Sequence, residues 1–320
     1  MTVSLQSTGK LKLREMRELE ESTKKKLFGT AALICVVLLA IASFGDLAIS
    51  NTVINYNSTV GTVFQTFGEF PVYLIFVLCG EIAMAYALRH SEEKLFAGTL
   101  FIGGFALSAW QLKQYLNEIS SYALSALKNI HAGKPMGLAN SDAATVKLSA
   151  GAALILWIVV YVIITLLVQY WMGKQDNDQL TRYLIVAVFA SLTVWFALEV
   201  NLALKDYWGR VRPYELNASQ KDFTPPWFHP NGVNGHKSFP SGHSMAGTLC
   251  IVFSWFAVQT KLRKRLWITG IVYAILLALS RVLIGAHFFS DVTFSVFLTA
   301  TIIFVMRELY DRLVSDDLKL

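Results

Sequence analysis

Apolar residues occur along this chain in long runs that are separated by shorter polar segments. A membrane-spanning helix needs about 20 consecutive, mostly apolar residues, and eight segments come close to this requirement. They lie at roughly 27–49, 71–88, 95–112, 148–172, 183–203, 243–260, 266–283 and 288–306. We therefore predict an all-α, polytopic membrane helical bundle of about eight spans. Residues 1–26 would form an N-terminal tail, 27–306 the membrane domain and 307–320 a C-terminal tail.

The composition supports the lipid bilayer as the main solvent of the chain. Of the 320 residues, 54% are hydrophobic and only 16% are charged, whereas soluble domains carry about 25% charged residues. The net charge of +6 fits basic residues placed beside membrane spans. No basic stretch is interleaved with aromatics, so no nucleic-acid partner is expected. Cys35, Cys79 and Cys250 all lie in apolar runs, which predicts buried core residues without disulfides or metal ligation.

The positions of Lys and Arg predict the orientation, because cytoplasmic segments are enriched in both. With the N-terminus inside, the inner segments hold most of the 28 Lys and Arg residues, and the outer segment 50–70 holds none. We therefore expect a multi-pass protein of the cell membrane with both termini in the cytoplasm. Residues 1–26 mix both charge signs, unlike a secretory signal. In the outer segment 113–147 we expect a short helix on the membrane surface.

A first polar cluster, K-D-Y-W-G-R-V-R-P, stands where the fifth span ends. Lys205, Arg210 and Arg212 place three cations on the outer side, where positive charge is least expected. Arg offers a fork of donors that matches phosphate oxygens, so the cluster suits an anion. The alternative is a group of interface anchors. Arg210 is a candidate for contact with a phosphate or a lipid headgroup.

A second cluster, F-P-S-G-H-S, comes directly before the sixth span. Ser241 can cap a helix that begins at Gly242 and His243. The N-terminus of a helix is a favourable site for an anion, and Gly242 lets the backbone approach a phosphate closely. An ordinary Ser-capped helix start is the alternative. His229 and His236, in the loop ahead of this cluster, are expected to be exposed.

A third cluster, S-R-V-L-I-G-A-H-F-F-S-D, separates the last two spans. His287 and Asp291 are four residues apart, so on a helix they would share one face. Asp291 could then hold one imidazole nitrogen and leave the other free as a nucleophile or base. Arg281 adds a further cation. With eight spans, all three clusters fall on the outer face of the membrane.

Together the clusters resemble the signature of the type-2 phosphatidic acid phosphatase superfamily, which reads K-x6-R-P, P-S-G-H and S-R-x5-H-x3-D. No fixed position departs from that pattern between residues 205 and 291. The family core has six helices, with the first motif after the third helix. Here the motif follows the fifth predicted span, so either two N-terminal spans are extra to a catalytic core at about 183–306, or one short run is not a true span. The matching residues are Lys205, Arg212, Pro213, Pro240, Ser241, Gly242, His243, Ser280, Arg281, His287 and Asp291.

The resemblance implies a membrane phosphatase that acts on a lipid phosphate, such as undecaprenyl pyrophosphate, phosphatidylglycerophosphate or phosphatidic acid. His287 would attack phosphorus to form a phosphohistidine, and Asp291 would orient it. His243 would protonate the leaving oxygen and then activate water. The predicted partners are therefore the lipid substrate and the bilayer, while the oligomeric state stays open.

The phosphate itself would be bound by side-chain cations and by backbone amides. The resemblance assigns this role to Lys205, Arg212, Arg281 and the amides near Ser241 and Gly242. These cations would supply the charge that a metal supplies in other phosphoryl-transfer sites. We accordingly expect no cofactor and no divalent metal.

Other readings stay open at this point. The same scaffold could be a lipid phosphotransferase, which passes the phosphoryl group to an acceptor other than water. A non-enzymatic anion transporter would leave the His–Asp pair unexplained, and the soluble vanadium haloperoxidases of the superfamily lack such apolar spans. Glu199 and Asn201 either orient Lys205 or pack between helices, and Glu81 in mid-span is expected to be paired inside the bundle.

Overall fold

The computed structural model describes residues 2–140, 146–228 and 230–320, with side chains except at 2–21, 24, 139 and 140. Within these ranges the regular structure is entirely helical, which confirms the predicted all-α architecture. The α-helices are α1 (Thr2–Val53), α2 (Thr59–Phe67), α3 (Phe70–Arg89), α4 (Lys94–His131), α5 (Ala150–Gly173), α6 (Asn177–Trp208), α7 (Gly242–Leu249), α8 (Thr260–Leu283) and α9 (Phe289–Leu313). Short 3-10 helices are η1 (Met136–Asn140), η2 (Pro213–Glu215), η3 (Cys250–Phe256) and η4 (Asp316–Leu318).

Seven helical segments in the described ranges are long and apolar enough to cross a membrane. They correspond to seven of the eight predicted spans, so the chain is a multi-pass membrane protein. The remaining prediction, residues 243–260, folds as the consecutive short helices α7 and η3. One expectation is wrong: residues 113–131 do not form a separate helix, because α4 continues unbroken through them to His131. At 38 residues, α4 is about 57 Å long, well beyond the roughly 30 Å of bilayer hydrocarbon.

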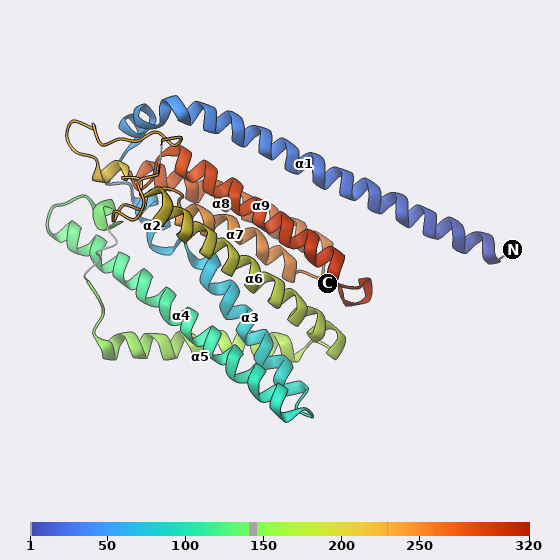
Figure 1. Ribbon diagram of the computed structural model, residues 1–320. Coiled ribbons are helices and arrows are strands. Elements are labelled where there is room, and N and C mark those ends of the chain that lie inside the picture. Colours follow the sequence, from blue (N-terminus) through green and yellow to red (C-terminus); the bar gives the residue numbers. More distant parts are fainter. Residues whose placement is uncertain (1, 141–145, 229) are drawn as a thin grey trace.

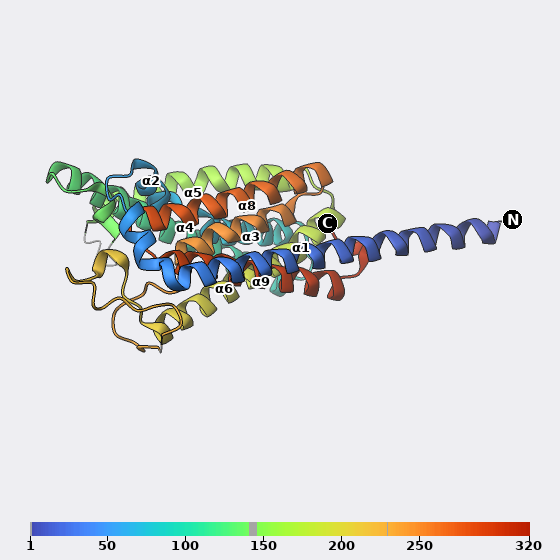
Figure 2. The ribbon, with the colours of Figure 1, turned by 90° about the horizontal axis from the view of Figure 1, so that it is seen from above.

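The helices lie nearly side by side in one bundle, with α1 and α5 at its edges (Figures 1 and 2). Helix α1 runs through the predicted boundary at residue 26 without a break and extends beyond the bundle. It packs against α9, where the ring of Phe28 stacks on that of Phe304 with centroids 4.5 Å apart. The C-terminus and the N-terminal end of α1 both lie at the end of the bundle opposite the 209–241 loop (Figure 1).

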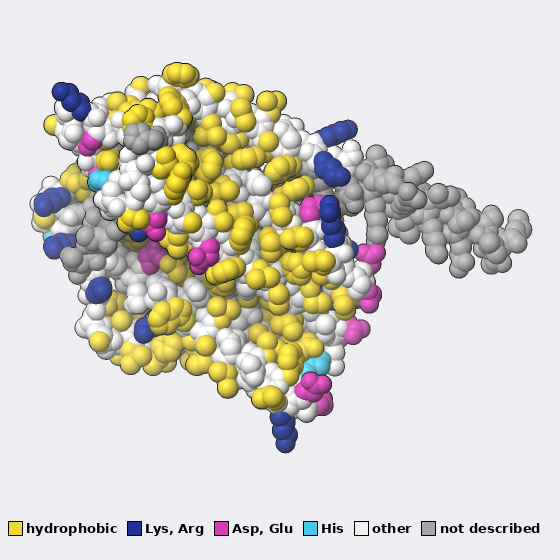
Figure 3. All heavy atoms as spheres, viewed as in Figure 1, with side chains coloured by type: hydrophobic (Ala, Val, Ile, Leu, Met, Phe, Trp, Pro, Cys, Tyr) yellow, Lys and Arg dark blue, Asp and Glu magenta, His cyan; other side chains and the backbone are white. Residues whose placement is uncertain are grey.

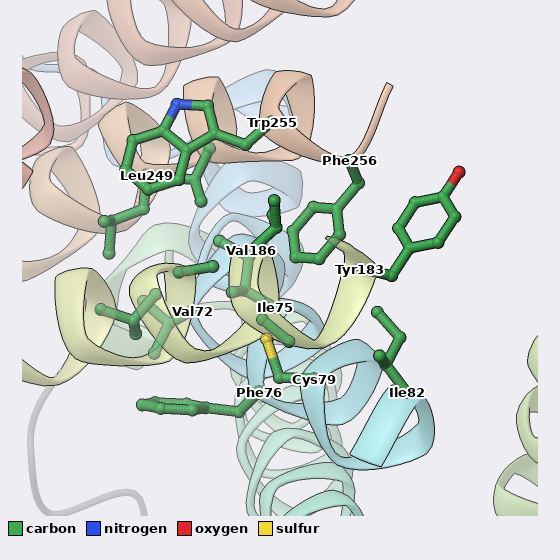
Figure 4. Close-up of a cluster of buried hydrophobic side chains, with 14 of the residues drawn as sticks. Val72, Ile75, Phe76, Cys79, Ile82, Tyr183, Val186, Leu249, Trp255 and Phe256 are labelled. Atoms are coloured by element: carbon green, nitrogen blue, oxygen red, sulfur yellow. The ribbon is translucent and has the colours of Figure 1, made fainter. Parts of the chain in front are cut away.

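The core lies where α3 meets α6, α7 and η3. Figure 4 shows Ile75 and Cys79 of α3 facing Val186 of α6, with Leu249 and Phe256 above them. Helix α3 is the most enclosed of the described spans: 13 of its 20 residues are buried, whereas in α5 only Met172 is buried. Helix α3 also meets α4 closely, because a Cβ on Gly80 would lie 2.4 Å from the carbonyl oxygen of Gly104. Such contacts between small residues are typical of helix packing in membranes.

The outer surface of the bundle is apolar over its middle. Figure 3 shows hydrophobic side chains across this face, with Lys and Arg gathered toward the two ends. Ile155, Leu166 and Leu167 of α5 and Ile34 and Val36 of α1 are more than half exposed. Because water would penalise so large an apolar surface, this band fits the hydrocarbon of a bilayer.

Two helix caps position the polar residues at one end of the bundle. Helix α6 ends at Gly209, whose φ of +53° is left-handed and whose amide donates to the carbonyl of Lys205. A Cβ on Gly209 would also lie 2.1 Å from the carbonyl oxygen of Gly232. Helix α7 begins at Ser241, whose side chain accepts a hydrogen bond from the amide of Ser244. Gly209 and Ser241 therefore fix where Lys205 and His243 stand.

Candidate active site

The three sequence clusters meet at one end of the bundle. Backbone contacts tie them together, since the amide of Ser241 donates to the carbonyl of Asp291 at 3.3 Å and the amide of Ser238 donates to the carbonyl of Arg210 at 2.9 Å. A Cβ on Gly242 would lie 3.1 Å from the Nζ atom of Lys205. The end of α6, the start of α7 and the α8–α9 turn thus enclose one polar site.

His287 lies in the turn between α8 and α9, just before α9 begins at Phe289. Its Nδ1 atom is 2.6 Å from the carbonyl oxygen of Ser238. A carbonyl accepts hydrogen bonds only, so Nδ1 carries the proton and the lone pair is on Nε2. The imidazole is almost fully buried, with 2% of its surface exposed. The ring is therefore held as the tautomer that a nucleophilic Nε2 requires.

Asp291 is near His287 but does not hold it in the predicted way. Its Oδ2 atom lies 3.8 Å from Nδ1 of His287, beyond a hydrogen bond. Instead Oδ2 accepts from the Oγ of Ser238 at 2.6 Å and from the amide of Phe288 at 2.9 Å. The prediction from helical spacing was wrong on this point because His287 precedes α9. Asp291 orients Ser238, whose carbonyl orients His287, and its charge remains close to the ring.

Arg210 also differs from its predicted place. It is fully buried, and its guanidinium donates from Nη1 to Asp291 Oδ1 at 2.5 Å and from Nη2 to Asp46 Oδ2 at 2.9 Å. Its plane packs over the ring of Phe288, 4.2 Å from the centroid. Both charged contacts are to protein carboxylates, so Arg210 stabilises the structure behind the site. Asp46 comes from α1, so this ion triplet fastens the N-terminal helix to the site.

The start of α7 agrees with the prediction of a capped helix. Ser241 is buried, and its Oγ accepts from the amide of Ser244 at 3.3 Å. The carbonyl of Ser241 accepts from the Oγ of Ser295 on α9 at 2.6 Å. The polar ends of Lys205 and Asn201 converge on Gly242, at 3.1 and 3.9 Å from the place where its Cβ would lie. A helix N-terminus beside a lysine is a suitable place for an anion.

His243 faces two acceptors from the α2–α3 region. Its Nδ1 lies 2.7 Å from Oε1 of Glu69, and its Nε2 lies 3.0 Å from the carbonyl oxygen of Gln65. With Glu69 ionised, only the imidazolium satisfies both contacts, since both ring nitrogens must then carry a proton. The ring of Tyr122, on α4, is nearly perpendicular to the imidazole, and the two ring centroids lie 6.2 Å apart. The contacts with Glu69 and Gln65 favour the protonated ring, and they oppose burial and the charge of Arg281, which lower the pKa of His243.

Three cations surround His287. Burial and then the charges of Arg212, Arg281 and Lys205 hold the pKa of His287 well below its usual range. Arg212 is itself fixed by a hydrogen bond from Nη1 to the hydroxyl of Tyr214 at 3.0 Å, and Arg281 is 1% exposed at the end of α8. A neutral imidazole within a cluster of cations is suited to attack a negatively charged phosphate.

Of the other predicted residues that the structure describes, only Asn201 lies at the site. Asn201 is buried beside Gly242, whereas Glu199 is exposed on the surface of α6. Glu81 is paired inside the bundle as predicted, and it accepts hydrogen bonds at 2.9 Å from Thr165 and Gln169. His236 is partly exposed and pairs with Glu215 at 2.9 Å, and His229 lies outside the described residues.

Sequence reasoning missed several residues of this site. Asp46 carried a usable signal, because an acidic residue inside an apolar span is costly and needs a partner. Glu69, Gln65 and Ser238 carried none, because each reaches the site through contacts far apart in the chain. Glu118 is the least expected, since α4 brings it to Glu69 only by continuing beyond the predicted third span.

Comparison with known proteins supports the resemblance drawn from the three clusters. The model of the PAP2 superfamily matches residues 181–314. A lipid A 4′-phosphatase of Francisella tularensis subsp. novicida is 31% identical over 117 residues, which is 35% of this chain and 53% of that protein. Phosphatidylglycerophosphatase B of Bacillus subtilis is 37% identical over 99 residues, which is 29% of this chain and 42% of that protein. The chain thus spans about half the length of the curated relatives it matches.

Among solved structures, a transmembrane PAP2-type phosphatidylglycerolphosphate phosphatase from Bacillus subtilis aligns with 79% of this chain and 99% of its own. The sequence identity is 19% and the TM-score is 0.34. The matched residues 181–314 include every residue of the three clusters.

Proposed function

We propose that this chain, whose residues 181–314 match the PAP2 superfamily, hydrolyses a phosphate or diphosphate ester of a membrane lipid through a phosphohistidine. The observation that carries the proposal is the state of His287. Its Nδ1 proton is held by the carbonyl of Ser238, so the Nε2 lone pair is available inside a cluster of three cations. A neutral nucleophile beside concentrated positive charge is what phosphoryl transfer from a dianionic substrate requires.

In the first step, Nε2 of His287 attacks phosphorus as the ester P–O bond breaks. Lys205, Arg212 and Arg281 bind the equatorial oxygens, together with the backbone amides that follow Ser241 at the start of α7. The leaving oxygen takes a proton from the imidazolium of His243. The phosphorylated His287 ring becomes positively charged, and the Asp291 carboxylate, 3.8 Å from Nδ1, stabilises that charge.

In the second step, water attacks the phosphohistidine. His243, now neutral, takes a proton from the water as the new P–O bond forms. The P–N bond breaks, its electron pair returns to Nε2 of His287, and inorganic phosphate leaves. Both histidines end in their starting forms, so the cycle is balanced in protons and electrons.

The position of the site favours a substrate with its phosphate at the membrane interface and its chains in the hydrocarbon. The site is at one end of the bundle, and the distribution of Lys and Arg favours the outer face for that end, with both termini in the cytoplasm. The two curated relatives are named as phosphatases of lipid A and of phosphatidylglycerophosphate. The proposed substrate class is therefore a lipid phosphate.

Phosphate release by the purified protein, from a panel of lipid monophosphates and diphosphates, tests the proposal. We expect free phosphate from at least one lipid, with and without a chelator, and none from the His287→Ala variant. Glu81→Gln is a suitable control, because Glu81 is buried in α3 away from the site. Transfer of label to an added alcohol in place of water would favour a phosphotransferase. Full turnover by His287→Ala would refute the nucleophile.

A further inference from the structure

A partly buried carboxylate outside the matched segment contacts His243. Glu69 stands at the junction of α2 and α3, and its Oε1 is 2.7 Å from Nδ1 of His243. This distance is that of a charge-assisted hydrogen bond. The side chains are 22% and 7% exposed, so water screens the pair weakly. Glu69 belongs to the N-terminal helices, which the superfamily match at 181–314 does not include.

We propose that Glu69 is the positioning residue of His243, which it holds protonated and oriented for the acid–base step. The proposal rests on the proposed function, because it assigns a role to Glu69 only through the acid–base role of His243. A second carboxylate of the site, Asp291, lies beside His287 in a comparable way. Each histidine would then have its own carboxylate, one from inside the matched segment and one from outside it.

The surroundings of Glu69 favour its ionised form. The carboxyl groups of Glu69 and Glu118 lie close together, and two adjacent carboxyl groups do not both ionise, so one of them carries a proton. Glu69 faces the cations, with His243 in contact and Lys205 nearby. Glu118 faces the neutral hydroxyl of Tyr73, which donates a hydrogen bond to it but stabilises a negative charge less than the cations beside Glu69 do. The shared proton is therefore better placed on Glu118, and the negative charge on Glu69.

The remaining charged or titratable groups around this pair come from neighbouring helices. They are Tyr115 and Tyr122 of α4, and Tyr273 and Arg281 of α8. The second acceptor of His243, the carbonyl of Gln65, is neutral and fixed in α2. When a leaving oxygen replaces that carbonyl at Nε2, the contact with Glu69 at Nδ1 can persist. Glu69 would thus keep the ring in place while the proton is transferred.

A comparison of two leaving groups tests this assignment. A lipid alkoxide needs a proton as it leaves, whereas the p-nitrophenolate of p-nitrophenyl phosphate is stable without one. We expect Glu69→Gln to lower kcat for the lipid phosphate at least about tenfold, a share of the 10²–10⁴-fold effect of a general acid–base group. The pre-steady-state burst of p-nitrophenolate, which reports phosphorylation of His287, should change less than about threefold.

Two further variants complete the test. Glu69→Asp keeps the charge but withdraws it from Nδ1, so we expect a smaller loss with the same selectivity for the lipid. Glu81→Gln makes the same change of charge about 18 Å along α3 and should affect neither substrate. Equal losses on both substrates in whichever Glu69 variant folds, or no loss on either, would overturn the proposal. Failure of the wild-type protein to release phosphate would instead refute the proposed function.

Discussion

Replacing Asp46 by Asn tests whether the buried ion triplet fastens α1 to the rest of the bundle. In the native protein, the Asp46 carboxylate accepts from Nη2 of Arg210 at 2.9 Å, from the amide of Ser290 at 2.9 Å and from the hydroxyl of Ser290. All three residues are 1% exposed or less. The substitution keeps the size of the side chain and removes its charge.

The expected magnitude follows from what remains around Arg210. Removal of one partner of a buried ion pair costs about 3–5 kcal/mol, because a buried charge is left uncompensated. Arg210 retains Asp291 at 2.5 Å, so the loss should fall at the low end, about 3 kcal/mol. The amide introduced at position 46 would also direct N–H donors toward the donors of Arg210 or Ser290, which adds to the cost.

Chemical unfolding in mixed micelles, followed by tryptophan fluorescence, measures this loss. Asp316→Asn is the matched control, because Asp316 forms an exposed ion pair with Lys319 at 2.9 Å. Exposed pairs contribute no more than about 1 kcal/mol. If Asp46→Asn and Asp316→Asn unfold within about 0.5 kcal/mol of each other, the stabilising role of the ion triplet is refuted.

Further predictions concern pH, backbone, orientation and metal. Arg212→Gln removes a cation that lowers the pKa of His287, so that pKa should rise toward its usual value near 6.5. The acid limb of kcat/KM against pH should then move to higher pH, and an unchanged or lower limb would contradict the electrostatic account. Gly209→Ala should destabilise the protein by about 1–2 kcal/mol, since φ there is +53° and the new Cβ would meet the carbonyl of Gly232; equal stability in a thermal melt would count against this. Ser219→Cys should react with a membrane-impermeant thiol reagent in intact cells, because position 219 is exposed in the 209–241 loop; labelling only after permeabilisation would reverse the proposed orientation. A chelator should leave turnover unchanged, because side-chain cations bind the phosphate, and loss of turnover that returns with a divalent metal would refute this.

The bundle was largely predictable because burial in lipid leaves a direct mark on sequence. A spanning helix needs a long apolar run whatever its neighbours are, so α5 and α8 could be identified without knowledge of any contact. The length of α4 could not, because its last five turns mix Tyr115 and Glu118 with apolar residues and face a polar site. The sixth predicted span, residues 243–260, was wrong as a single long helix, since the segment folds as the two short helices α7 and η3.

The site was predictable where the chemistry is local in sequence. Ser241 caps α7 two residues ahead of His243, and the run F-P-S-G-H-S is enough to identify both residues. The contact of His243 with Glu69 spans 174 positions, and the contact of Asp46 with Ser290 spans 244. No local sequence pattern predicts contacts between residues so far apart in the chain. The spacing of His287 and Asp291 was misleading because residues four positions apart share a helix face only when both lie within the helix. His287 lies before the start of α9.

The central claim, that His287 is the nucleophile, is tested most directly by trapping the phosphorylated protein. Wild-type protein is mixed with lipid labelled in its phosphate, quenched in alkali within milliseconds, digested and sequenced by mass spectrometry. We predict an acid-labile, alkali-stable phosphate on the peptide that contains His287, and none in the His287→Ala variant. Rapid turnover without a phosphorylated intermediate, or a phosphate on a different residue, would contradict the account.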